Sequence, residues 1–220
     1  MFNAEATQEN DRMEFFRVVS TIDPDNALWN YYGTGNQQKV QRVSPDINNR
    51  IFGLKDKQFP AFQSVKGLGN TAVSSLKNTT KKNSACPAKS DLGWYVDLEE
   101  NERITGALAI KDGKVQAVRY LPNNADLCSP GKSYYTEHGY LCGNALRRIY
   151  LGEGISTGVV NYKGKTYFGI TGEATGDIKD DQGNVVGRLT GKGFGVFNTP
   201  EAQQGPGAEN IKHESWREVF

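Results

Sequence analysis

Few residues of this 220-residue chain could carry chemistry, and the most conspicuous stand in a glycine-rich stretch, "YYGTGNQQ". Gly33 and Gly35 flank Thr34 there, and glycines beside a hydroxyl can cradle a phosphate. A phosphate loop needs G-x-x-x-x-G-K-[ST], or G-x-G-x-x-G between a strand and a helix, and this stretch has only two of those glycines. We therefore expect the two glycines to end a strand where another backbone passes closely.

A histidine offers the second candidate for chemistry. The segment "TEHGYLC" brings Glu137, His138 and Cys142 close together in sequence. Neighbouring residues of a strand face opposite sides of the sheet, so Glu137 and His138 do not converge on one metal ion. We expect His138 to be a surface residue, and neither it nor His213 has the context of a catalytic triad. The sequence predicts no catalytic residue and no enzymatic activity.

Two acidic clusters are weak candidates for calcium ligands. Asp23 and Asp25 stand in "DPDN", and Asp177, Asp180 and Asp181 stand in "DIKDDQGN". Calcium needs several oxygens converging from one loop, as in D-x-D-x-D-G, and neither cluster has that spacing. Asp and Asn are also typical of hairpin turns, which is the role we expect for both clusters. No cofactor is predicted.

Composition excludes several classes of partner. The formal net charge is +1, with 26 basic and 25 acidic side chains, so no global field attracts nucleic acid or an anionic membrane. No apolar run approaches the ~20 residues that span a bilayer. The N-terminus shows no signal peptide, so either the protein stays inside the cell or its export signal lies elsewhere.

The elements that must position these residues are short strands. Alternation of apolar and polar residues recurs along the chain, with three hairpins turning at Asp112-Gly113, Lys163-Gly164 and Gln182-Gly183. No window has a convincing helical period, which predicts an all-β chain of about eleven or twelve strands. We interpret residues 1–220 as a single domain with a polar insertion loop at about 64–91, and the tail "IKHESWREVF" as an alternating strand.

The hairpins also repeat. "RITGALAIKDGKVQAVRYLP" and "GISTGVVNYKGKTYFGITGE" share one plan, and similar hairpins at intervals of about 45 to 50 residues are typical of propeller blades. About three four-stranded antiparallel blades fit this length, and a ring needs at least four. The prediction is a partial β-propeller, completed by another chain or a missing segment that pairs with open strand edges on its N-terminal side.

Three pieces of the sequence together resemble a known family. These are "LWNYYGTGNQQ" followed by "NNRIFGLKD", then "LGWYVDLEENERITGALAIKDGKVQAVRYLPNNADLCSPGKSYY", and finally "SWREVF". Their order and spacing, from about Phe16 to the C-terminus, resemble the C-terminal β-propeller of PilY-type proteins. Those proteins are the adhesin and assembly factors at the tips of bacterial type IV pili.

The resemblance implies a non-catalytic module at the cell surface, acting in pilus assembly and surface adhesion. Its expected partners are the segment with the remaining blades, the minor pilins and a host or abiotic surface, with the export signal on another piece. The family's calcium loop, D-x-D-x-D-x-x-x-D, does not occur in this chain, so calcium binding is not carried over. Two alternatives stay open: a carbohydrate- or protein-binding propeller unrelated to pili, and a quinoprotein-like propeller enzyme.

An exported setting gives the cysteines and aromatic residues a second interpretation. One disulfide is expected among Cys86, Cys128 and Cys142, because an odd number cannot pair fully. Loop closure favours Cys128 with Cys142, strand parity favours Cys86 with Cys142, and both pairings stay open. Six aromatic residues could form a ligand surface, although packing between blades is expected for most: Trp29, Tyr31, Tyr32, Trp94, Tyr95 and Tyr134.

Overall fold

The computed structural model describes residues 2–56, 59–60, 71–126, 128–172, 175–190 and 193–198. The regular elements among these residues are strands, apart from the 3-10 helix Val73–Ser75, and the all-β prediction is confirmed. Within these ranges no helix has the length and apolar character to cross a membrane. The predicted strand in the tail, His213 and residues 64–70 of the polar insertion lie outside the described residues.

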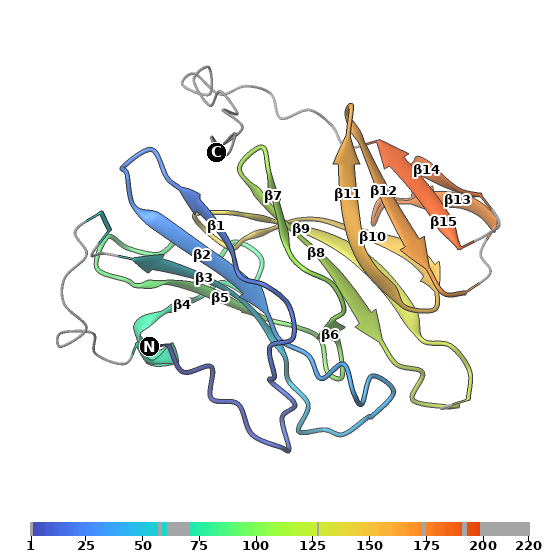
Figure 1. Cartoon of the computed structure of the whole chain (residues 1–220), viewed down its shortest axis with the longest axis horizontal. Helices are drawn as coiled ribbons and strands as arrows, with labels where there is room; N and C mark the ends of the chain where they lie inside the picture. The colour runs from blue at the N-terminus through green and yellow to red at the C-terminus, as the bar shows by residue number, and fades with distance from the viewer. Residues whose placement is uncertain are drawn as a thin grey trace, which may run out of the picture.

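The strands form three sheets that follow one another along the chain, as predicted (Figure 1). The first sheet has the order β1-β2-β3-β5-β4. The second has the order β10-β9-β8-β6, with β7 also paired to β8. The third has the order β11-β12-β15-β14-β13.

The strand bounds, sheet by sheet, are as follows. The first sheet contains β1 (Val19–Ile22), β2 (Leu28–Gly33), β3 (Arg50–Asp56), β4 (Lys77–Asn78) and β5 (Gly93–Asp97). The second contains β6 (Arg103–Ile104), β7 (Ala109–Lys111), β8 (Lys114–Leu121), β9 (Lys132–Gly139) and β10 (Ala145–Glu153). The third contains β11 (Ser156–Tyr162), β12 (Lys165–Ile170), β13 (Thr175–Lys179), β14 (Val185–Thr190) and β15 (Phe194–Asn198).

The predicted hairpin turns are present. At the β7–β8 turn Asp112 and Gly113 have φ of 51° and 70°, and at the β11–β12 turn Lys163 and Gly164 have φ of 46° and 71°. Positive φ at both central residues is the type I′ geometry that matches the twist of a hairpin. The β13–β14 hairpin turns at Gly183, which has φ of 86°. Local sequence therefore sets these three pairings.

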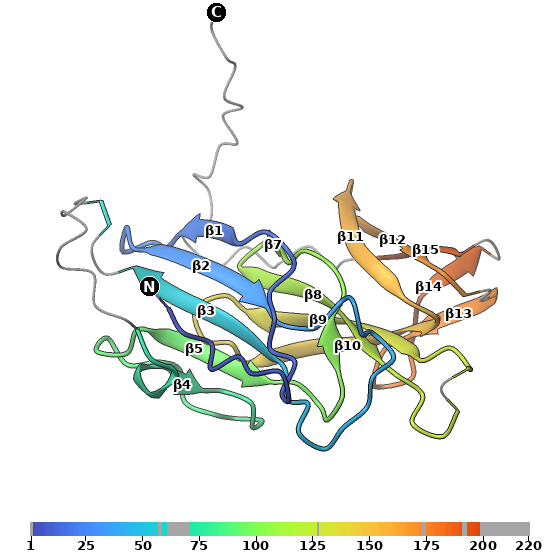
Figure 2. The same ribbon diagram turned by 60° about the horizontal axis from the view of Figure 1, so that its bottom comes forward.

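The sheets differ in detail from uniform four-stranded blades. The first adds the short strand β4, which pairs in parallel with β5. In the third, β15 returns to lie between β12 and β14. Figures 1 and 2 show β1, β7 and β11, one strand from each of the three sheets, along the same upper side of the molecule. This recurring placement gives the molecule its partial-propeller arrangement.

Two apolar clusters join neighbouring sheets. The first contains Trp29, Tyr31 and Trp94 of the first sheet with Val115 and Ala117 of the second. The other brings β8, β9 and β10 of the second sheet against the third, and its buried members are Val118, Tyr135, Ile149, Leu151, Phe168, Ile170, Ile178 and Phe197. The second sheet is therefore buried on both faces.

The outer face of the first sheet is covered by its own chain. Phe2 packs edge-on against Tyr32 and Phe52, with ring centroids 5.9 and 5.0 Å apart. Val73 and Leu76, from the described part of the polar insertion, are buried in the same cluster. A bridge between Phe2 and Thr71 holds the two covering segments together. This cluster therefore covers the outer face of the first sheet.

Removing the aromatic ring of Phe2 tests this cover. Phe2→Ala should lower the free energy of unfolding by about 2 kcal/mol, because the partly buried ring leaves apolar contacts behind. Binding of an apolar dye to the native protein should also rise, since the face beneath becomes accessible. Phe15→Ala is the matched control: Phe15 is 42% exposed, and its loss should cost less than ~0.5 kcal/mol. Equal losses in urea denaturation would contradict the cover.

Candidate interaction surface

The Gly-Thr-Gly stretch lies where the first sheet meets the second. Gly33 ends β2, and a Cβ there would collide with the side chain of Ile104 in β6. A Cβ on Gly35 would collide with Arg103 and the backbone of Ile104. The Thr34 hydroxyl donates to Asn49 and accepts from the Arg50 amide at 2.9 Å, so it is occupied within the fold. The stretch is a close-packing site between sheets and not a phosphate cradle.

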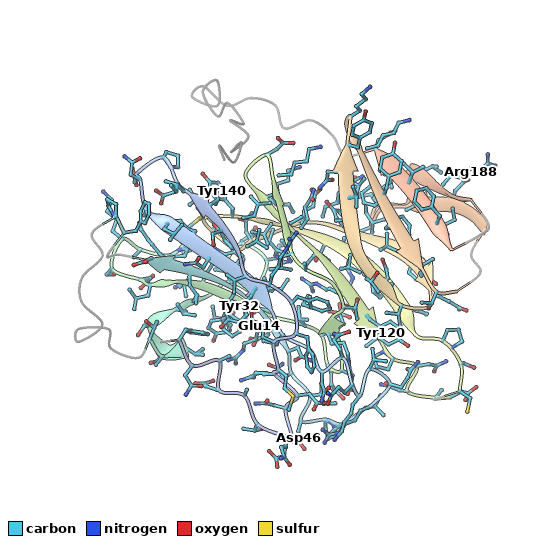
Figure 3. The ribbon with its side chains drawn as sticks, in the orientation of Figure 1. Glu14, Tyr32, Asp46, Tyr120, Tyr140 and Arg188 are labelled. Carbon is cyan, nitrogen blue, oxygen red and sulfur yellow. A yellow bond between two sulfur atoms is a disulfide. The ribbon has the colours of Figure 1, made fainter. Side chains whose placement is uncertain are left out.

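Three of the predicted aromatic residues form the core between the first two sheets. Trp29, Tyr31 and Trp94 are buried, and the rings of Trp29 and Tyr31 stack with centroids 6.2 Å apart. Trp94 Nε1 and Tyr31 Oη both donate to the carbonyl oxygen of Tyr140, at 2.8 and 3.1 Å. Tyr140 belongs to the β9–β10 turn, yet Figure 3 shows it over the first sheet. These aromatic residues bind one sheet to the next.

The other three predicted aromatic residues lie outside this core. Tyr32 and Tyr95 belong to the cluster beneath Phe2, where Tyr32 is buried and Tyr95 half-buried. Burial raises the pKa of Tyr32 far above its ordinary value. Tyr134, on β9, packs against Tyr150 and lies beneath the Arg148 guanidinium, 4.1 Å from the ring centroid. The structure does not gather the six into a single surface.

The two acidic clusters hold turns in place. Asp23 accepts from the amides of Asp25 and Ala27 and from Trp29 Nε1, at 2.8 to 2.9 Å. Burial disfavours its charge, but these hydrogen bonds and Lys55 together lower the pKa of Asp23 below its ordinary value.

In the β13–β14 turn, Asp180 accepts from the amides of Gln182 and Asn184 and from the Asn184 side chain, and the pKa of Asp180 is lowered. Asp177 and Asp181 are exposed. Among the described residues no three His, Cys, Asp or Glu side chains gather as a metal-binding group.

A disulfide ties the first sheet's insertion to the second sheet. Cys86, between β4 and β5, bonds to Cys142 in the β9–β10 turn, and Cys128 is an exposed free thiol. Gly143, with φ of 69°, lies against Thr79 and the Trp94 ring, so a side chain there would collide with both. The disulfide thus fastens the same turn that Trp94 and Tyr31 hold by hydrogen bonds.

Removing this bond should be costly. The bonded cysteines are 56 residues apart, so their cross-link should stabilise the fold by about 4 kcal/mol through the unfolded chain. Cys86→Ser and Cys142→Ser should each lower the urea midpoint accordingly, while Cys128→Ser should change the free energy of unfolding by less than ~0.5 kcal/mol. An effect of Cys128→Ser as large as the other two would contradict this pairing.

His138 is buried, and the prediction of a surface histidine is wrong. β9 is an inner strand of a sheet covered on both faces, so the residues on either side of it are enclosed. Nδ1 of His138 donates to the carbonyl of Gly143 at 2.9 Å, and Nε2 accepts from Arg119 at 2.6 Å. Arg119 also donates to Thr136 and forms a buried ion pair with Glu102. Both ring nitrogens therefore serve the fold.

Burial and the positive charge of Arg119 lower the pKa of His138 to about 3. An unfolded chain takes up this proton near pH 6.5, whereas the folded protein stays neutral there. The contribution of neutral His138 to the free energy of unfolding is therefore fully present above about pH 6.5 and is lost as the pH falls toward 3.

Because the unfolded chain takes up this proton and the folded protein does not, His138 should lower the free energy of unfolding by about 2 kcal/mol between pH 7 and pH 5. His138→Gln keeps an acceptor for Arg119 but does not titrate, so its free energy of unfolding should fall less steeply over that range. Urea denaturation of both proteins at pH 7, 6 and 5 measures the difference. Parallel pH profiles would show that His138 titrates equally in both states.

A G-x-S-x-G pattern, which can mark a nucleophilic serine, occurs at Gly154–Gly158 around Ser156. A nucleophile elbow needs a strand-to-helix turn, whereas Ser156 begins the strand β11. Its side chain is buried, and its hydroxyl has no hydrogen-bond partner among the residues that the structure describes. The local geometry is therefore that of a sheet strand and not of a nucleophile elbow.

The surface that stands out is the outer face of the third sheet, here called the open face. Along β11, β12 and β15, the residues Val160, Tyr167 and Val196 lie directly opposite one another. Their neighbours Phe168 and Phe197 point the other way, into the core. Large apolar residues of these strands and of β14 are well exposed: Val160 67%, Tyr162 59%, Val185 59% and Phe194 44%.

Charged residues border this apolar band. Arg188 on β14 pairs in register with Val196 on one side and Asp177 on the other. A shallow hollow of about 390 Å³ lies there, and its lining includes Lys165, Asp177, Arg188 and Val196. Figure 3 shows Arg188 at the far right of the molecule, away from the other two sheets. Sequence reasoning missed this surface, although the alternation in "VVNYKGKTYFG" carries its apolar residues.

Comparison with solved structures gives an informative likeness. No protein-family model matches the sequence, and no curated protein matches it. Among solved structures, the chain is similar to the C-terminal domain of PilY1 from Pseudomonas aeruginosa, with a TM-score of 0.56 and 12% sequence identity. The likeness covers 79% of this chain and 45% of that chain.

The likeness defines a class of fold. The chain has a β fold of three sheets in a partial-propeller arrangement. That fold is PilY1-like, and this chain spans less than half of the matched PilY1 domain.

Proposed function

We propose that this chain is a non-catalytic module of a type IV pilus tip, acting in pilus assembly and surface adhesion. The observation that carries the proposal is the PilY1-like fold. Within the described residues, Asp23, Asp180, His138 and the Gly-Thr-Gly stretch hold strands, turns and sheets together. The functional element that we propose is an exposed protein surface.

The proposed setting is the cell surface, where the disulfide between Cys86 and Cys142 would persist. The proposed partners are the minor pilins, a host or abiotic surface, and the chain or segment carrying the remaining blades. The length relation supports this last partner, because the matched portion is 45% of the PilY1 chain.

Deletion of the encoding gene in its own piliated host tests the function. Pili sheared from the cell surface should fall strongly in amount, measured by immunoblot of the major pilin, and attachment of cells to glass should fall with them. Expression of the wild-type chain from a plasmid should restore both. Unchanged surface pili and attachment in the deletion strain would overturn the proposal.

A separate measurement addresses catalysis. Pyrroloquinoline quinone and calcium, added to the purified chain, should produce no change in the cofactor's absorbance spectrum. A saturable spectral change would replace the adhesion module with a quinoprotein-like enzyme. Glycan binding by a chain whose deletion leaves piliation intact would instead favour a carbohydrate-binding propeller.

A further inference from the structure

We propose that the open face of the third sheet is the docking surface for a further β-sheet, carried by a partner polypeptide and packed face to face. This inference rests on the proposed function for its partner and adds the location of the contact. The docked sheet would present an apolar band to Val160, Tyr167 and Val196, with carboxylates at its border.

The exposed band is the first argument for docking. Val160 and Tyr162 of β11 are more than half exposed, and Phe194 of β15 stacks on Tyr167 with ring centroids 6.0 Å apart. Soluble proteins rarely leave a contiguous apolar patch of this kind in water unless another surface covers it. The band lies on regular strands, so its shape is that of a sheet face.

Continuity with the existing interfaces indicates what covers it. The first sheet packs onto the second through Trp94 and Tyr31, and the second packs onto the third through Tyr135 and Val118. At each step an aromatic residue from the middle of one sheet lies in an apolar cluster shared with the next sheet. The third sheet presents Tyr167 on its far face, so one more sheet would continue the series.

The outer face of the first sheet, at the opposite end of the series, cannot dock onto the open face of another copy. The outer face of the first sheet is already covered by Phe2, Val73 and Leu76. A second copy of the chain therefore has no matching free face to offer in a head-to-tail stack. The occupant that we propose is therefore a sheet of another polypeptide and not a second copy of this chain.

The charged residues on the open face indicate which side chains a partner should carry. Strand alternation places Lys165 and Lys179 on the open face with Arg188, while the acidic group among these strand positions is Asp177. Two open faces brought together would oppose like charges, which disfavours pairing of two copies. A sheet with Asp or Glu around its apolar band would complement this border.

Site-specific cross-linking in the native host tests the contact. The full chain carries the photoreactive residue p-benzoylphenylalanine in place of Tyr162, or in place of Phe15 as the matched control on another exposed aromatic position. After irradiation of intact cells, position 162 should yield one adduct and position 15 none. Mass spectrometry should place the adduct in a different polypeptide, within a strand of alternating apolar residues flanked by carboxylates.

A second substitution separates docking from folding. Val160→Asp should reduce the adduct from position 162 by about tenfold or more. It should leave the thermal midpoint of the purified chain unchanged, because Val160 is 67% exposed. The charge-reversing change Arg188→Glu should weaken the adduct in the same way.

Three outcomes would overturn the inference: no adduct above the control, an adduct to a second copy, or an adduct to residues 199–220 of the same chain. An adduct with the expected partner in a host whose pili are unaffected by gene deletion would support the docking surface and reject the pilus function. Failure of the docking surface and failure of the proposed function are therefore distinguishable.

Discussion

A β-sheet has two faces, and the need to cover each apolar face governs this structure. The second sheet meets the requirement by lying between the other two. The outer face of the first sheet is covered by Phe2, Val73 and Leu76, which lie in the segments that precede β1 and β5 in the chain. The third meets it on one face only, through Phe168 and Phe197. Among the described residues, the other face of the third sheet is exposed and carries large apolar side chains.

The second sheet is buried on both faces, so its polar side chains are removed from water and need hydrogen-bond partners inside the protein. Arg119 meets this requirement by linking Glu102, Thr136 and His138. His138 extends the chain of contacts to Gly143, beside the disulfide. The β9–β10 turn is therefore held from three directions: by His138, by the two aromatic donors of the first sheet, and by Cys86. This turn joins the first two sheets more firmly than apolar packing alone would.

The PilY1-like fold and the open face both concern how this chain relates to a larger assembly. The fold relates this chain to less than half of a larger domain. The open face is where a larger assembly would continue. Asp23, Asp180 and His138 are engaged in turns and inter-sheet contacts, and the surface recognition that we propose makes no demand on them.

Local sequence determined the hairpins, because Asp112-Gly113 and Lys163-Gly164 favour type I′ turns whatever lies around them. Alternation likewise determined the all-β class, and a glycine-ended strand at Gly33 follows from the steric freedom of glycine. Only the tertiary structure decided that His138 is buried, because burial depends on whether a strand lies at the centre or the edge of a stack. It alone also decided which end of the molecule is open. Phe2 reaches Phe52 from a distant part of the chain, and no local pattern records which sheet face a distant segment will cover.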